Sequence, residues 1–316
     1  IVSRDINMRV KCDALGLQCE DYVDNRVIKT VDHIYTGFTK CLVDDQLVDQ
    51  FYAGESVLLE EHRLFPNQYL MLVSSSNEKK TALARFENHG SPLKKINDRR
   101  RGVWGIKSRN KEQAFAIDML MNDDIPVVTL VGAAGTGKTL LAAAAGLEHV
   151  LERGNESKYK RLIISRPVQP LGKDIGFLPG TLEEKMAPWI APIKDNLKFL
   201  MGNDKATFET YMQQGAIEIE ALTYIRGRSI SNAYIIVDES QNLTNHELKT
   251  IITRVGEGTK IVLTGDVEQI DNIYIDETSN GLTYAVEKFK EHEIAGHISL
   301  QKGERSRVAS IAAKIL

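Results

Sequence analysis

The chain contains few of the residues that mark disulfide-stabilised or membrane-embedded proteins. Its 316 residues include only 3 cysteines, 2 tryptophans and 8 prolines. Three cysteines without metal-ligand spacing argue against a disulfide framework or a zinc site, and no apolar run approaches the roughly 20 residues of a membrane-spanning helix. Neither sign of charge dominates, because 40 basic and 43 acidic residues leave a formal net charge of −3. We therefore expect a cytoplasmic protein with no membrane partner.

The most specific pattern is a glycine-rich loop between an apolar run and an alanine-rich stretch. It fits G-x-x-x-x-G-K-[ST] and consists of Gly132, Ala133, Ala134, Gly135, Thr136, Gly137, Lys138 and Thr139. The glycines let consecutive backbone N–H groups surround a phosphate chain, and the following helix adds its positive N-terminus. Lys138 brings an ammonium group to the outer phosphates. The pattern predicts a nucleoside triphosphate site, the alternative being a glycine turn beside a lysine.

A second apolar run, residues 233–237, leads directly into Asp238 and Glu239. Such a run is typical of a buried parallel strand. Together with the Thr139 hydroxyl, Asp238 is placed to hold Mg²⁺, and Glu239 is placed to deprotonate the attacking water. Taken alone, an acid pair can also be a solvated strand end. When it follows a phosphate loop in the same chain, the acid pair predicts magnesium-dependent hydrolysis of the nucleotide.

A third apolar run begins at Lys260 and ends in the sequence TGDVEQ, which places Asp266 and Gln269 after a strand. Ligands of open α/β sheets bind at such strand ends. We predict that Gln269 senses the γ-phosphate, as a glutamine does in other nucleotide hydrolases. The alternative is a surface glutamine beside a capping acid.

These three blocks resemble motifs I, II and III of superfamily 1 helicases. Between them, the stretches SRPVQP (165–170), GKDIGFLPGT (172–181) and EKMAPW (184–189) resemble the signature of the PhoH family of ATPases. Over residues 100–316 the chain is identified as a member of that family. The resemblance implies an α/β fold with a single RecA-like P-loop NTPase domain built on a parallel sheet, and it implies ATP and Mg²⁺ as ligands.

Two further residues are candidates for the site. Gln113 stands where related motors place a glutamine that reads adenine; without the resemblance it is a polar residue on an amphipathic helix. Arg305 is the candidate arginine finger, with Arg307 as its competitor and a surface salt bridge as the alternative role. Because the chain has one phosphate loop, we expect a neighbouring subunit to complete the site in a homo-oligomer. The resemblance supports a hexameric ring.

The chain divides into four segments. Residues 1–26 resemble the C-terminal remnant of a PIN nuclease domain, in which Asp5 is either a stranded nuclease residue or a helix cap. Residues 27–93 alternate apolar and polar positions in short runs and predict a small antiparallel β domain. Residues 94–111 form a basic linker that contacts phosphates or is simply solvated, and its Trp104 either packs between domains or stacks on a base. Residues 112–316 form the ATPase domain.

The function expected from this sequence is ATP hydrolysis that moves along or unwinds single-stranded RNA. The RNA would feed a fused PIN ribonuclease domain, of which only the remnant is present. Two alternatives belong to other classes: an ATP-gated assembly module that moves no strand, and a small-molecule kinase. The kinase does not explain why Asp238 and Glu239 accompany Asp266 and Gln269.

Overall fold

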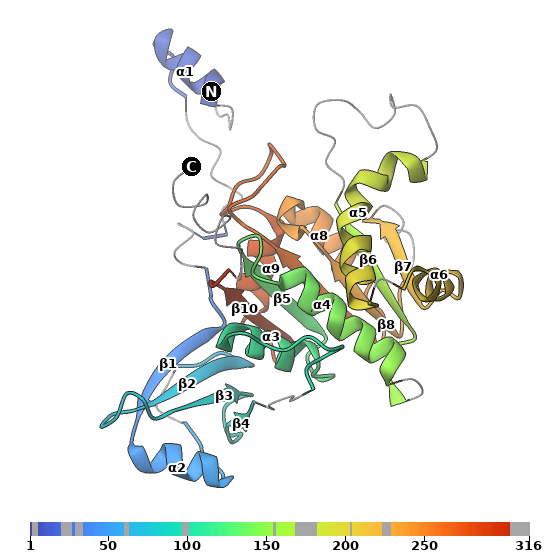
Figure 1. Ribbon diagram of the computed structural model, residues 1–316. Coiled ribbons are helices and arrows are strands. Elements are labelled where there is room, and N and C mark those ends of the chain that lie inside the picture. The colour runs from blue at the N-terminus through green and yellow to red at the C-terminus, as the bar shows by residue number, and fades with distance from the viewer. Residues whose placement is uncertain are drawn as a thin grey trace.

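The chain folds around two β-sheets, one on each side of helix α3 (Figure 1). This computed structural model describes residues 1, 6–19, 27–28, 34–59, 63–96, 101–153, 156–167, 182–202, 204–222 and 229–303. The smaller sheet has the strand order β1-β2-β3-β4, and the larger has the order β10-β5-β9-β8-β6-β7. The larger sheet carries the motifs identified in the sequence.

All neighbouring strands of the larger sheet are parallel, which confirms the expected α/β fold with a parallel sheet. In β8, Tyr234 and Ile236 belong to one apolar cluster, whereas Ile235 and Val237 belong to another. The sheet is therefore buried on both faces, as parallel sheets usually are. Its strands are β5 (Val127–Gly132), β6 (Arg161–Arg166), β7 (Ile217–Ala221), β8 (Ala233–Val237), β9 (Lys260–Gly265) and β10 (Ala295–Leu300).

Helices cover both faces of this sheet. Helices α3 (Lys111–Leu120), α4 (Lys138–Leu147) and α5 (Leu182–Leu200) pack into the cluster of Tyr234, and a π-helical turn, Glu148–Glu152, extends α4. Helices α8 (Asn245–Ile252) and α9 (Gly281–Phe289) pack on the other face. Helix α6 (Lys205–Gln213) lies beside α5 and β7. None of the described helices combines the length and the hydrophobicity needed to cross a membrane.

The strand order brings the functional loops together. Strand β9 lies between β5, which leads into the glycine-rich loop, and β8, which leads into Asp238 and Glu239. Because all three strands are parallel, their carboxyl ends meet at one edge of the sheet. That edge is where the three sequence motifs converge.

The smaller sheet is mixed, so the expectation of an antiparallel β domain was wrong for one pair of strands. Strand β1 (Phe38–Val43) runs parallel to β2 (Gln68–Ser74), whereas β3 (Thr81–Phe86) and β4 (Lys94–Lys95) are antiparallel. The physical reason is helix α2 (Asp45–Ala53), which carries the chain back between β1 and β2 and buries Val48 and Phe51 against the sheet. A parallel pair requires such a crossover.

Two further expectations for this region are modified by the structure. Not every short run expected in residues 27–93 is a strand: residues 56–59 form none, although Val57 is buried in the core of the smaller sheet. At the start of the expected basic linker, Lys94 and Lys95 pair with Arg85 and Ala84 of β3.

The smaller sheet is docked on the larger one through aromatic and backbone contacts. Tyr69 of β2 stacks on Phe115 of α3 with ring centroids 4.8 Å apart. The Asn67 amide donates to the backbone oxygens of Glu293 and Ala295, at 2.7 and 2.9 Å. The backbone N–H of Ser299 in β10 donates to the oxygen of Thr36 at 3.0 Å. The two sheets are therefore joined along α3 and β10.

Helix α1 (Ile6–Ala14) lies apart from both sheets in Figure 1. Asp5 lies outside the described residues. The assignment of residues 1–26 to a PIN remnant stays a prediction.

Candidate active site

The glycine-rich loop connects β5 to α4, as the sequence predicts. Gly135 and Gly137 have φ angles of +82° and +93°, which disfavour any residue with a Cβ atom. A Cβ on Gly132 would lie 2.4 Å from the backbone oxygen of Leu300, so the loop also needs glycine where β5 approaches β10. The Lys138 ammonium group lies over the loop and donates to the backbone oxygens of Gly132 and Ala133. The path of the loop thus depends on glycine at these three positions.

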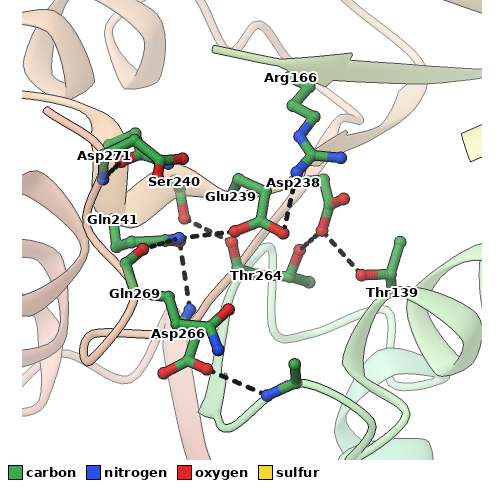
Figure 2. A network of polar contacts seen from close by, with 12 residues as sticks. Thr139, Arg166, Asp238, Glu239, Ser240, Gln241, Thr264, Asp266, Gln269 and Asp271 are labelled. Carbon is green, nitrogen blue, oxygen red and sulfur yellow. Dashed lines mark hydrogen bonds and ion pairs between the residues drawn. The ribbon is translucent and has the colours of Figure 1, made fainter. Parts of the chain in front are cut away.

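Asp238 joins the loop to the two central strands. One carboxylate oxygen, Oδ1, accepts hydrogen bonds from the Thr139 hydroxyl at 2.7 Å and from the Thr264 hydroxyl at 2.6 Å (Figure 2). Asp238 is only 5% exposed. Two hydroxyls therefore hold the carboxylate in a fixed orientation beside the start of α4.

This pair fits a magnesium ion that is shared with phosphates. Thr139 and Asp238 offer a hydroxyl and a carboxylate, the oxygen ligands that Mg²⁺ prefers. Within the described ranges there is no group of three or more His, Cys, Asp or Glu side chains that could hold a metal ion by itself. A magnesium ion at Thr139 and Asp238 would accordingly take its other ligands from the nucleotide and from water.

The Glu239 side chain is oriented by its backbone conformation and by contacts to both carboxylate oxygens. Its φ of +54° and ψ of +38° place it in the left-handed region, which is uncommon for a residue other than glycine and often occurs at functional sites. Oε1 lies 3.1 Å from a guanidinium nitrogen of Arg166. Oε2 accepts a hydrogen bond of 2.6 Å from the Gln241 amide. The carboxylate is thus held in one orientation, as Figure 2 shows.

Arg166 and Gln241 were not predicted from the sequence to be functional residues. Arg166 is the last residue of β6, the strand next to β8. The sequence feature that could have indicated its role is a charged residue at the end of an apolar run. Gln241 is fully buried, and its amide also donates to the backbone oxygen of Gln269 at 2.8 Å. A Cβ on Gly265 would lie 2.3 Å from the Gln241 oxygen, so this glycine makes room for the amide.

The third motif is attached to the same network. Asp266 accepts a hydrogen bond of 3.0 Å from the backbone N–H of Ala134, which ties the end of β9 to the phosphate loop. The backbone N–H of Asp266 in turn donates to Gln241 at 3.2 Å. Gln269 itself is exposed. Its role as a γ-phosphate sensor stays a prediction. The amide side chain that is buried in this network is that of Gln241.

Gln113 lies against the phosphate loop. Its amide nitrogen donates to the backbone oxygen of Thr136 at 3.1 Å, and its amide oxygen accepts from the backbone N–H of Arg109 at 2.9 Å. The helix cap at Asn110 fixes its backbone through a hydrogen bond of 2.9 Å. Trp104 is partly buried against the core cluster of Tyr234, and its indole N–H donates to the backbone oxygen of Leu200 at 2.8 Å; stacking on a base stays a prediction.

The arginine candidates Arg305 and Arg307 lie outside the described residues. The described chain reaches Gly303, and the backbone N–H groups of Gln301 and Lys302 donate to the Glu112 carboxylate at 3.0 and 3.3 Å. The segment leading to Arg305 therefore leaves the sheet beside the N-terminal turn of α3.

Comparison with known proteins supports the family resemblance. The PhoH family model, described as PhoH-like protein, matches residues 105–315. Protein PhoH2 of Bacillus subtilis (strain 168) is 46% identical over 321 residues, which cover 100% of this chain and 72% of that protein. Protein PhoH2 of Mycolicibacterium smegmatis is 36% identical over 320 residues, with coverages of 100% and 70%.

Two helicases are similar among the solved structures. The Pif1 helicase from Candida albicans matches with a TM-score of 0.35 at 16% identity, covering 66% of this chain and 43% of that one. The UvsW helicase from bacteriophage T4 matches with a TM-score of 0.36 at 11% identity, covering 94% and 77%. Since the family model spans more than half of the residues and the PhoH2 proteins align over all of them, this chain belongs to the PhoH family.

Proposed function

We propose that this chain is a magnesium-dependent ATPase whose hydrolysis drives translocation on, or unwinding of, single-stranded RNA. The proposal that ATP is hydrolysed rests on the orientation of Glu239. Its carboxylate is held by Arg166 and Gln241 next to the Thr139–Asp238 pair. A protein that only held a nucleotide would have no need for a second, oriented carboxylate beside the metal position.

The chain's own residues supply the steps of hydrolysis. Loop backbone N–H groups and Lys138 bind the phosphates, and Thr139 with Asp238 holds the metal position. When bound, Mg²⁺ neutralises charge on the β- and γ-phosphate oxygens. Glu239 orients a water molecule and takes its proton while the water oxygen attacks the γ-phosphorus. The bond to the bridging oxygen breaks, which leaves ADP and inorganic phosphate.

The RNA part of the proposal is supported by the order of the motifs along the chain and by the family resemblance. The phosphate loop, the acid pair and the TGDVEQ block follow one another as in superfamily 1 helicases, and all three meet in one hydrogen-bonded network. Basic residues precede α3, where they are suited to contact phosphates. Delivery of the RNA to a fused PIN domain is part of the same proposal.

The test is phosphate release from Mg-ATP with and without single-stranded RNA or DNA of equal length, with Glu239→Gln as the background. Turnover that is lost in Glu239→Gln and stimulated by RNA more than by DNA is the expected result. Turnover indifferent to both strands would favour the ATP-gated assembly module. Release no faster than that of Glu239→Gln would refute the ATPase.

We also propose that the chain acts as a ring, most simply a hexamer, in which Arg305 reaches the neighbour's nucleotide. In support, Ile273 and Tyr274, on the loop after Gln269, are 86% and 73% exposed, and apolar side chains this exposed are common at protein interfaces. A mixing experiment tests the shared site. Lys138→Ala and Arg305→Ala should each be inactive, yet an equal mixture should regain about a quarter of wild-type turnover, because random assembly pairs intact halves at about one interface in four.

No recovery in the mixture would refute a finger supplied by a neighbour. Arg307→Ala, mixed in the same way, decides which arginine acts. Measurement of molar mass in solution, with and without ATP, separately tests the ring.

A further inference from the structure

A cavity of about 430 Å³ adjoins the phosphate loop on the side of α3 and α5. This volume lies within the roughly 300–1,000 Å³ typical of ligand sites. Two of its lining residues, Gly135 and Gly137, belong to the loop itself, and Leu140 and Leu141 line it from the first turn of α4. A nucleotide carries its base one ribose away from its phosphates. The cavity is therefore within reach of the base of a nucleotide whose phosphates lie in the loop.

An exposed aromatic ring lines this cavity. Phe199, near the end of α5, is 60% exposed and is the one exposed phenylalanine in the described part of the chain. The backbone on both sides of Phe199 is held in place. Leu197 is fully buried, and the backbone oxygen of Leu200, which directly follows Phe199, accepts the hydrogen bond from Trp104. A rigidly mounted ring open to water is a suitable platform for a base, since every base has a π-face on which an aromatic ring can stack.

The Gln113 side chain is arranged to brace the loop. Both ends of its amide are bound to backbone groups, those of Thr136 and Arg109. Gln113 is only 5% exposed, and a Cβ on Gly137 would lie 3.3 Å from its amide nitrogen. Turning the amide to read the edge of a base would break both hydrogen bonds. The geometry therefore argues against edge reading by Gln113 and favours stacking and shape as the source of base recognition.

We propose that this cavity is the base subsite and that Phe199 is its stacking residue, so that the site accepts adenine and guanine nucleotides with similar affinity. The inference rests on the proposed nucleotide binding at the phosphate loop and adds the chemistry by which the base is recognised. It assigns Gln113 to positioning the loop.

Equilibrium binding of nucleoside diphosphates tests this proposal without the complication of hydrolysis. The probes are ADP, GDP and pyrophosphate, which lacks a base, each measured by calorimetry with Mg²⁺ against the whole chain. Phe199→Ala should weaken ADP and GDP by about 5- to 150-fold, the range of about 1–3 kcal/mol that a base–aromatic stack contributes. Pyrophosphate binding should be unchanged. Phe199→Tyr, which keeps the ring, should restore the wild-type affinities.

Leu42→Ala is the matched control. Leu42 is also exposed, at 70%, but lies on β1 in the smaller sheet. The Leu42→Ala variant should bind ADP, GDP and pyrophosphate with wild-type affinity. The wild type itself should bind ADP and GDP within about tenfold of each other, because neither edge is read.

Three results would overturn the inference. Unchanged ADP affinity in Phe199→Ala would show that the ring does not contact the base. Equal weakening of ADP and pyrophosphate would show that the substitution disturbs the loop. A preference for ADP of about 100-fold or more that disappears in Gln113→Ala would make Gln113 the reader of the base. Failure to bind either ADP or pyrophosphate would refute the nucleotide site itself, and normal binding without hydrolysis would refute only the proposed ATPase.

Discussion

The contact between Arg166 and Glu239 leads to a specific kinetic prediction. At a separation of 3.1 Å, two unit charges attract by about 5 kcal/mol at an effective dielectric constant of 20. The two side chains are 24% and 31% exposed, so desolvation and screening reduce this value. A net contribution of about 1.5–3 kcal/mol, as for a hydrogen bond to a charged group, is the reasonable magnitude. That is the free energy available to hold the carboxylate in the orientation proposed for catalysis.

Replacing the guanidinium by an amide, in Arg166→Gln, should therefore lower kcat about 10- to 150-fold. The KM for ATP should change little, because the described contact of Arg166 is with Glu239 and not with the phosphate loop. Arg166→Lys is the matched control, since it keeps the charge but loses the fork of donors, and it should lose less activity. Steady-state phosphate release over a titration of Mg-ATP measures both constants.

A double substitution tests whether Arg166 acts through Glu239. If it does, adding Arg166→Gln to Glu239→Gln should cause no further loss in single-turnover phosphate release. A further loss in the double variant would contradict this reasoning. So would a rise in kcat for Arg166→Gln, which would mean that the ion pair restrains the base, or an increase in KM that matches the fall in kcat, which would mean that Arg166 binds the nucleotide.

Three further predictions concern the metal, the pH and the docking of the sheets. Thr139→Ala should raise the Mg²⁺ concentration for half-maximal turnover about tenfold, because one oxygen donor is lost; an unchanged midpoint in a Mg²⁺ titration would contradict this. Burial lowers the pKa of His149 to about 4 and that of His297 to about 3. As the pH falls below about 6.5, the unfolded chain binds protons before the folded chain does. The free energy of unfolding should therefore decrease by about 1.4 kcal/mol per pH unit for each histidine. Urea unfolding at pH 7.5 and at pH 5.5 measures this decrease. Gly37→Ala should destabilise the fold by more than about 2 kcal/mol, because its Cβ would lie 1.9 Å from the backbone oxygen of His297 at a φ of +73°; Gly54→Ala, with a φ of +82° but open space, should cost only about 1 kcal/mol in the same unfolding assay.

Local patterns in the sequence were sufficient to predict the residues that the structure brings together in the candidate site. The phosphate loop and the acid pair each lie within a few consecutive residues after an apolar run, and the structure places them at one edge of a parallel sheet. A buried strand and a glycine turn are local properties. For this reason Thr139, Asp238 and Glu239 could be assigned together before any tertiary information was used.

Contacts between strands distant in the chain could not be predicted in this way. The pairing of Arg166 with Glu239 depends on β6 lying next to β8, and the sequence does not state the order of strands in a sheet. The parallel pairing of β1 and β2 was missed for a related reason. The residues of α2 lie between two apolar runs, and recognising a crossover there requires knowing that Val48 and Phe51 face the sheet.

Helix α3 contacts the smaller sheet, the phosphate loop and the backbone after β10 through three residues of one turn. Phe115 receives the ring of Tyr69 from β2. Gln113 holds the phosphate loop at Thr136, and Glu112 holds the backbone after β10, from which the chain continues toward Arg305. Because a helix is stiff over three or four residues, these contacts are held at fixed distances from one another. The smaller sheet, the phosphate loop and the backbone after β10 therefore all rest on one turn of α3, although the smaller sheet supplies none of the catalytic groups proposed above.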